Sequence, residues 1–396
     1  MVATLPTRHA ILDRFMRESG KADEMGVMQA EVAHRFADVQ GARATWFSYA
    51  RHTPDLLAKL GLIGVHDRLV VCADDFEPAF RELFRWNDPV FVSDPTPQAF
   101  LRASMDDPDS EEARLIPEGS PASYAHPAGI HADRLFWFVE SEGCLGLRVP
   151  HIRALAEAAA AVGAIIIVDN TIPSYFGCNP ISLGAHVVLE ALDRVAEGRL
   201  EKKVVATSVA RSVVGKGRRR LVSPNSEEAY RLLSFSLGDP DMPTRATALS
   251  EADVCAISDG MDSFAGRMRR HVDHAHAIAE YLFCHPAVGH VFYPGLKSHP
   301  DRALAPNVLL HGFGPAIDFS LQGTHDERMM VRHLRFLTTC TCSHRDARAG
   351  GALTRIGIAA KRDLNYLRLF AGTDDPLSIA DSLDQALRLF CNPPEP

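Results

Sequence analysis

Short apolar runs alternate with longer amphipathic segments through the first half of this chain. Five of the runs predict buried strands: 67–72 (DRLVVC), 90–92, 135–139 (LFWFV), 164–168 and 204–209 (VVATSV). Residues 151–162 form an alanine-rich segment typical of a helix, and Gly163 stands where a C-cap glycine belongs. Strands that alternate with helices predict an α/β fold with a mainly parallel sheet.

The pattern changes after the LGDP segment at 237–240. Beyond it we predict a long amphipathic helix, two strands and a closing helix: 263–284, 316–321, 354–359 and 376–389. We interpret this half as a smaller α+β domain. The predicted domains are a short N-terminal arm, a large α/β domain and a C-terminal α+β domain: 1–35, 36–240 and 241–396. The polar stretch 106–119 predicts a loop.

Composition narrows the class of protein. The 396 residues are 46% hydrophobic, enough to bury two cores, and the net charge of -8 argues against nucleic acid or an anionic membrane as partner. The eight cysteines are scattered, which is typical of reduced thiols. The N-terminal residues carry charges where a signal peptide is apolar, and no run approaches the ~18 apolar residues of a membrane span. We expect a soluble cytoplasmic protein.

Histidines and cysteines gather in two places that could suggest a metal site: His271, His274 and His276, and then Cys340, Cys342 and His344. The three histidines lie in the long amphipathic helix, where polar residues at those positions are expected to face solvent. The CTCSH segment lacks a second ligand pair at a structural-zinc spacing. We therefore predict no metal site.

Several motifs are similar to those of one enzyme family. The segment 164–171 reads AIIIVDNT, 180–185 has the spacing PLxLGA, 267–296 begins RMRRH and ends YPGL, and 367–376 reads LRLFAGTDDP. With these motifs the chain resembles, from about Val32 to Leu389, the Cys/Met-metabolism family of pyridoxal-phosphate enzymes. That family includes cystathionine γ-synthase, cystathionine lyases and methionine γ-lyase. The resemblance implies a fold type I transferase-like architecture.

The resemblance assigns cofactor roles to two residues. The pyridine nitrogen of pyridoxal phosphate must stay protonated to accept electrons, and Asp169 matches the family's carboxylate for this task. The family's tyrosine that stacks on the ring falls on Phe76, which keeps an aromatic ring but lacks the hydroxyl. From the residues alone, an aspartate that caps a strand and a phenylalanine of the core remain alternatives.

Arginine stands where the family has its cofactor lysine. The motif S-x-T-K is best matched by SVAR at 208–211, followed by Gly215, with an insertion at about 188–203; a gapless alignment selects Asp193-Arg194 instead. A guanidinium, with a pKa above ~12, is not a nucleophilic amine. We predict that Arg211 is inactive at the lysine position. Pyridoxal phosphate then binds non-covalently at best, and otherwise there is no cofactor.

Ser208 is predicted to contact the cofactor. Ligands of parallel sheets lie beyond the carboxyl ends of the strands, which is where we expect Asp169 and Ser208. Arg368 matches the arginine that binds the substrate α-carboxylate through two hydrogen bonds, with an arginine that satisfies a buried helix terminus as the alternative.

Other family features are altered. The family's Tyr-x-Arg arm falls near 21–23 (KAD), and its glycine-containing phosphate loop falls at 48–53 (SYARHT). Cys144 replaces the asparagine beside the ring. The bulky side chains of the altered loop are expected to crowd a phosphate.

Three functions remain open. The first is a degenerate binding or partner protein in a homo-oligomer, a dimer or tetramer, or in a hetero-oligomer with an active paralogue. The second is a repurposed enzyme that binds a small anionic or amino-acid ligand through Arg211 and Arg368, with Lys216 as the obvious substitute amine. The third is an active carbon–sulfur lyase or transferase of Cys/Met metabolism. None of these involves nucleic acid or a membrane.

Overall fold

The computed structural model describes residues 8–107, 132–144, 146–214, 221–242, 244, 247–323, 327–340, 352–361 and 364–391. The predicted loop at 106–119 lies outside the described residues from position 108 onward. The same holds for Gly215, Lys216, Cys342 and His344.

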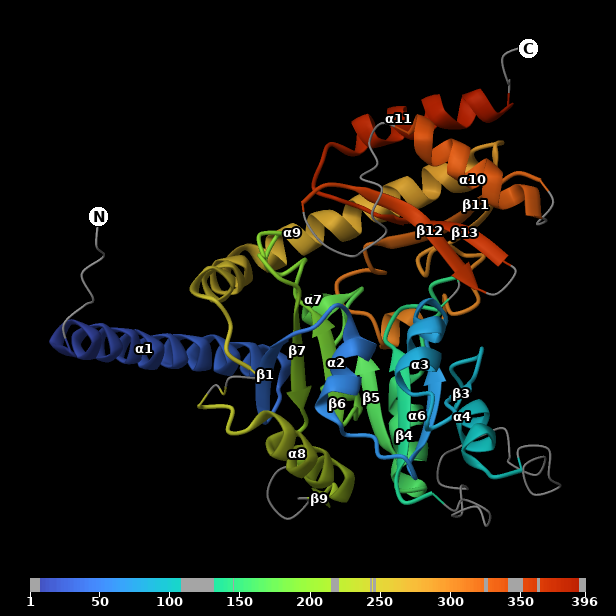
Figure 1. Ribbon diagram of the computed structural model, residues 1–396. Helices are drawn as coiled ribbons and strands as arrows, with labels where there is room; N and C mark the ends of the chain where they lie inside the picture. Colours follow the sequence, from blue (N-terminus) through green and yellow to red (C-terminus); the bar gives the residue numbers. More distant parts are fainter. Residues whose placement is uncertain are drawn as a thin grey trace.

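A seven-stranded sheet lies at the centre of the larger part of the molecule (Figure 1). Its strands, in spatial order, are β1 (Ala44–Tyr49), β7 (Val204–Val209), β6 (Val187–Ala191), β5 (Ile165–Asp169), β4 (Leu135–Glu140), β2 (Arg68–Cys72) and β3 (Val90–Phe91). The five strands from β6 to β3 are parallel, whereas β7 is antiparallel to both β6 and β1. The predicted mainly parallel sheet of an α/β fold is confirmed.

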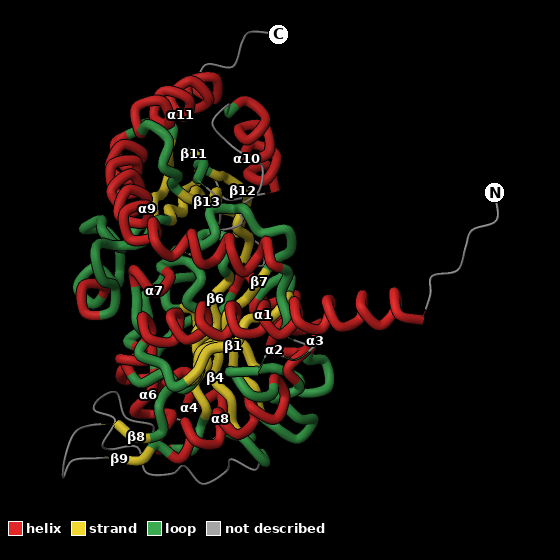
Figure 2. Tube along the Cα trace, turned by 90° about the vertical axis from the view of Figure 1, so that its left-hand side faces the viewer, coloured by secondary structure: helices red, strands yellow, loops and turns green. Residues whose placement is uncertain are grey.

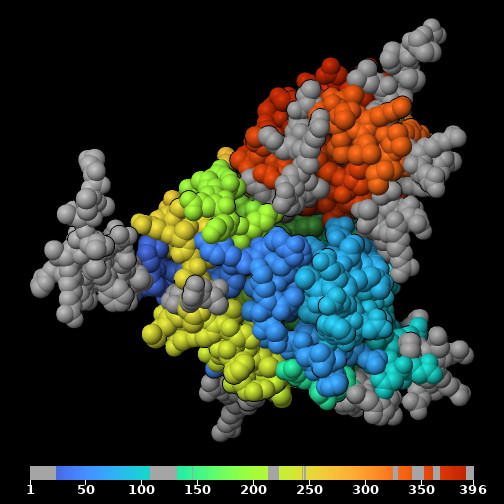
Figure 3. Space-filling view, viewed as in Figure 1, coloured from blue at the N-terminus to red at the C-terminus, as the bar shows by residue number. Residues whose placement is uncertain are grey.

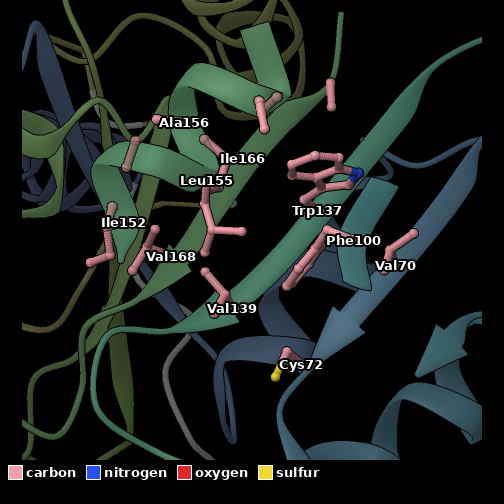
Figure 4. Close-up of a cluster of buried hydrophobic side chains, with 14 of the residues drawn as sticks. Val70, Cys72, Phe100, Trp137, Val139, Ile152, Leu155, Ala156, Ile166 and Val168 are labelled. Atoms are coloured by element: carbon pink, nitrogen blue, oxygen red, sulfur yellow. The ribbon is translucent and has the colours of Figure 1, made fainter. Parts of the chain in front are cut away.

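Helices cover both faces of this sheet. One face packs against α4 (Pro97–Ser104) and α6 (Ile152–Ala161). The other packs against α2 (Thr53–Leu60), α3 (Glu77–Leu83) and α8 (Pro224–Leu237). Trp137 and Ile166 pack with Leu155 on the first face (Figure 4), whereas Phe136 and Ile167 belong to the core on the second. Strands buried on both faces require such continuous apolar runs.

A smaller antiparallel sheet forms the C-terminal part. Its strands, in spatial order, are β10 (Val288–Phe292), β11 (Ala316–Leu321), β13 (Leu364–Phe370) and β12 (Arg355–Lys361). One face packs against the C-terminal half of α9 (Glu251–Cys284), α10 (Glu327–Thr339) and α11 (Pro376–Cys391). Along β13, Leu367 and Leu369 enter this core, so Arg368 between them lies on the opposite face.

The N-terminal segment forms a long helix, α1 (Arg8–Gln40). Its C-terminal half packs Val32 and Phe36 against residues of α9 such as Ile257. Its N-terminal end extends away from the rest of the molecule (Figures 1 and 2). The remaining elements are short: α7 (Ser174–Gly177), β8 (Val213–Val214), β9 (Leu221–Val222) and the 3₁₀ helices Asp74–Phe76, Pro180–Leu183 and Ala305–Asn307. The domain boundaries at 35 and 240 remain predictions.

His271 of α9 is buried rather than facing solvent. It is 1% exposed, and its Nδ1 donates to the Ala371 carbonyl oxygen at 2.6 Å. Burial lowers the pKa of His271 to about 4. The expectation that all three helix histidines face solvent is therefore wrong for this one, because residues next to β13 cover that side of α9. His276 is exposed.

The described part of the chain contains no group of three or more His, Cys, Asp or Glu side chains placed to hold a metal ion. None of its helices is both long and apolar enough to span a bilayer.

Candidate functional site

A cavity of about 720 Å³ lies at the carboxyl edge of the large sheet. Glu140 ends β4 and Asp169 ends β5; the two are paired in register and both line the cavity. Ile358 of β12 and Arg368 of β13 line it from the smaller sheet. In the space-filling view the two parts of the molecule meet along a furrow (Figure 3). This is the edge where parallel sheets position ligands.

Carboxyl groups dominate the charged lining. The described lining residues include five acidic side chains: Asp75, Glu140, Glu142, Asp169 and Asp193. The permanent cations among them are three: Arg51, Lys203 and Arg368. Burial raises the pKa of Glu140, Glu142 and Asp169, because it disfavours the ionised form. The cavity is therefore acidic, with several carboxyls that hold their protons tightly.

Asp169 lies where the sequence predicted it, at the end of a buried strand. It is 3% exposed. Its Oδ1 accepts from the Thr171 amide at 2.8 Å, and its Oδ2 accepts from the Thr53 hydroxyl. Both carboxylate oxygens therefore already have a donor from the protein.

The N-terminus of α2 borders the cavity and is capped by its own residues. His52 is the N-cap, and its Nδ1 accepts from the Asp55 amide at 3.1 Å. Pro54 has no amide hydrogen, and the Asp55 amide is used by the His52 cap. Of the first three helical residues, Thr53 alone therefore keeps an amide that could bind an anion. The helix start thus offers few donors to an outside anion.

Asp55 provides a negative charge at this helix start. It is 5% exposed and lies within 2.9 Å of Lys59 Nζ. Burial raises its pKa, but hydrogen bonds from the Arg51 amide and Lys59 outweigh burial and lower the value to about 2. A carboxylate of the protein therefore already occupies the favourable position near the positive end of the helix.

Phe76 contributes an aromatic wall. It lines the cavity and is half-buried. Its ring lies next to that of His52, with 5.7 Å between the centroids and 35° between the planes. The predicted aromatic ring is thus at the cavity, while its role toward a cofactor remains a prediction.

Arg368 is on the cavity wall, but its guanidinium is engaged by the protein. Its Nε and Nη2 donate to the Asp318 carboxylate at 2.7 and 2.8 Å. Nη1 donates to Asp75, and Nη2 also donates to the Cys144 carbonyl oxygen at 2.9 Å. The Nε–Nη2 edge of the guanidinium could bind a substrate carboxylate through two hydrogen bonds, but Asp318 already occupies it.

Ser208 and Arg211 lie at the opposite end of the sheet. Because β7 is antiparallel to β6, its last residue pairs with Val187, the first residue of β6. Ser208 Oγ is 2.8 Å from Thr45 Oγ1, and the exposed Arg211 donates to the Ala42 carbonyl oxygen at 3.3 Å. Neither lines the cavity. The expectation that Ser208 shares an edge with Asp169 is wrong, because the direction of β7 reverses it.

Of the two arginines that the alternative alignments place at the lysine position, Arg194 is the one that lies close to the cavity. It follows β6 directly after Asp193, which lines the cavity, as the gapless alignment proposes. Arg194 is 3% exposed, donates to the Ile172 carbonyl oxygen and lies 5.7 Å from the Phe370 ring centroid. Burial lowers its pKa to about 10, and the nearby Glu142 and Glu190 carboxyls limit that decrease.

Sequence reasoning missed Glu142 and Lys203. Glu142 stands two residues beyond the end of β4, so the strand-end rule that selected Asp169 could also have selected it. Lys203 precedes β7, whose start lies at the cavity only because the strand is antiparallel. No pattern in the apolar residues signals that direction.

Known proteins resemble this chain in sequence. Residues 128–346, just over half of the chain, match the family model described as Cys/Met metabolism PLP-dependent enzyme. Cystathionine gamma-lyase of Dictyostelium discoideum is 29% identical over 197 residues, covering 49% of this chain and 44% of the relative. O-succinylhomoserine sulfhydrylase of Pseudomonas aeruginosa is 30% identical over 202 residues, covering 51% and 45%. These matches span less than half of each relative's own length.

A solved structure extends the likeness to almost the whole fold. Cystathionine gamma synthase from Xanthomonas oryzae, in complex with aminoacrylate and cysteine, aligns with a TM-score of 0.69 at 21% identity. The alignment covers 91% of this chain and 85% of that one. The shared architecture is that of fold type I enzymes that use pyridoxal phosphate. The match over residues 128–346 establishes that the chain belongs to the Cys/Met metabolism family of PLP-dependent enzymes.

Proposed function

We propose that this chain is a degenerate member of its family that forms no covalent Schiff base with pyridoxal phosphate and acts as a binding protein or partner subunit. The observation that carries the proposal is Arg194, which is buried three residues beyond the end of β6 with its guanidinium bonded to the Ile172 carbonyl oxygen. Adding to an aldehyde requires a neutral amine. Even with a lowered pKa of about 10, this guanidinium is charged at neutral pH.

The residues that line the cavity do not fit the cofactor either. Its phosphate would need several amide donors, but His52 and Pro54 remove two of them at the start of α2. The Asp193 carboxyl of the lining would repel it. The Thr53 hydroxyl already donates to Asp169, the residue expected to hold the pyridine nitrogen. We therefore infer that pyridoxal phosphate is held non-covalently at best, and we derive no reaction step through it.

A second candidate function is favoured by Lys203. It is the one lysine among the described lining residues. Burial lowers the pKa of the nearby His52 imidazole most, and the positive charges of Arg51 and Lys203 lower it further. A repurposed enzyme, or an active carbon–sulfur lyase or transferase, could use this amine in place of the family's lysine.

Borohydride reduction separates the two functions. The protein is incubated with pyridoxal phosphate, its visible absorbance is recorded, and its intact mass is measured after reduction. We expect no yellow colour beyond the free cofactor and no mass gain. A mass gain that Lys203→Arg abolishes, and that the neighbouring Lys202→Arg leaves intact, would overturn the proposal in favour of the enzyme.

The partner role is tested separately. We propose that the chain assembles with itself or with a lysine-containing paralogue, since the family's sites lie at subunit interfaces. Sedimentation equilibrium of the purified chain should give a mass at least twice that of one chain. A monomer that also fails to associate with a co-expressed paralogue would contradict this role.

A further inference from the structure

We propose that the cavity binds a small organic dication, an aliphatic diamine or polyamine, instead of an anionic cofactor. This inference rests on the proposed function, because it requires that pyridoxal phosphate does not fill the cavity. It is carried by three features: an unpartnered buried carboxylate, an excess of acidic over basic lining residues, and apolar walls between the charges.

Glu142 provides the first feature. It lines the cavity and is 1% exposed, and neither of its carboxylate oxygens has a hydrogen-bond partner among the described residues. Arg194 and Arg368 attract it electrostatically, but their guanidiniums donate elsewhere, to Ile172 and to Asp318. A buried carboxyl without donors is unfavourable. An ammonium group carries three donors and a positive charge, so it supplies what Glu142 lacks.

The charge balance supports two positive charges on the ligand. Among the described lining residues there are five acidic side chains and three permanent cations. Arg368 shares its charge between Asp75 of the lining and Asp318, which lies outside it. Burial keeps several of these carboxyls protonated in the empty cavity, and a dication would favour their ionised form.

The walls fit the stem of such a ligand. Phe76, Ile172, Ile358 and Phe370 line the same cavity. Methylene groups pack favourably against such side chains, and aromatic faces attract ammonium groups. The volume of about 720 Å³ is in the range of small-molecule sites.

Other ligand classes fit less well. An anion would find Arg368 bonded to carboxylates and the start of α2 capped by His52. A metal ion would find no group of three or more ligands placed for it in the described residues. An organic cation needs neither feature.

Proton release would accompany binding. Burial raises the pKa of Glu142 well above its ordinary value, so the empty cavity keeps this carboxyl protonated and an ammonium favours its ionised form. The titratable and charged groups that interact with Glu142 are Arg194, Arg368, Asp318, Cys178 and Tyr293. We therefore expect the affinity to increase with pH until the carboxyl is ionised in the free protein.

Isothermal titration calorimetry with butane-1,4-diamine and with spermidine tests the proposal. We expect saturable binding, while the isosteric neutral butane-1,4-diol gives none. Glu142→Gln should weaken amine binding at least tenfold, whereas Glu157→Gln, an exposed acid on α6, should leave it unchanged. Thermal unfolding of both variants verifies that they are folded. An absence of amine binding, or equal binding by Glu142→Gln, would overturn the inference.

The two proposals fail in different measurements. The reduction experiment uses pyridoxal phosphate without added amine, and the calorimetry uses amine without pyridoxal phosphate, because the two react in solution. No mass gain and no amine binding would overturn this inference alone. A cofactor adduct would overturn the proposed function, and with it the premise of this inference.

Discussion

The same two strands behave differently in their middle and at their ends. Trp137 of β4 and Ile166 of β5 are 0% exposed and lie in a continuous apolar core. A few residues further along, Glu140 and Asp169 are nearly as deeply buried, at 6% and 3%, but carry carboxyl groups. Burial stabilises the fold in the first region and opposes ionisation in the second. The apolar middle of the sheet therefore provides the stability, whereas the edge holds buried carboxyl groups at a cost in stability.

The stability of the carboxyl edge of the sheet depends strongly on a single residue, Arg368. Replacing it with Met would leave Asp318, which is 0% exposed, and Asp75 without their cation. We expect a loss of about 3–5 kcal/mol in the free energy of unfolding, measured by urea denaturation. A second substitution, Asp318→Leu, should restore part of the loss. A change below about 1 kcal/mol in the free energy of unfolding of Arg368→Met would contradict the comparison. The buried carboxyls at the edge would then not need a cation of the protein beside them.

The middle of the sheet should respond through volume instead of charge. Ile166→Ala removes three carbons from the cluster around Trp137 (Figure 4) and should cost about 2–4 kcal/mol by urea denaturation. Ile166→Val, the conservative control, should cost about 1 kcal/mol. Both should leave amine binding unchanged. Weakened binding in a folded Ile166→Val protein would contradict the separation of the two regions.

Much of this division could be predicted from sequence. The strands at 204–209 and 316–321 have the predicted bounds. The sequence does not predict β1, since its residues ATWFSY mix small, aromatic and hydroxyl side chains, and its last two overlap the segment matched to a phosphate loop. The pattern of apolar residues identifies strands whose side chains are mostly apolar. It does not identify a strand such as β1, in which tertiary contacts bury polar and apolar side chains alike.

The site was predicted less completely than the fold. Asp169, Phe76 and Arg368 line the cavity, but Ser208 does not, because the same apolar run fits a strand of either direction. The connection at 192–203 forms no helix, which is typical of antiparallel neighbours. Glu142 lacks hydrogen-bond donors because residues distant in the sequence direct their donors elsewhere. No local sequence pattern reveals this.

Glu190 lies at the boundary between the two regions and gives the smallest effect. It is 1% exposed on β6, and burial raises its pKa from 4.5 to about 8, although the Ser174 hydroxyl bonds to it. Between these values the unfolded chain has lost the proton that the folded protein keeps. Stability therefore falls as pH rises from about 4.5 to 8 and then levels.

A neutral amide at this position should remove that slope. Glu190→Gln should gain on the order of 2 kcal/mol over the native protein between pH 6 and pH 8, measured by urea denaturation. His186, whose pKa burial lowers to about 4, opposes the trend below pH 6.5, but it is present in both proteins and cancels from their difference. Parallel stability curves would mean that Glu190 is ionised in the folded protein. The apolar middle would then tolerate a charge as readily as the cavity edge, and burial alone would not distinguish the two regions.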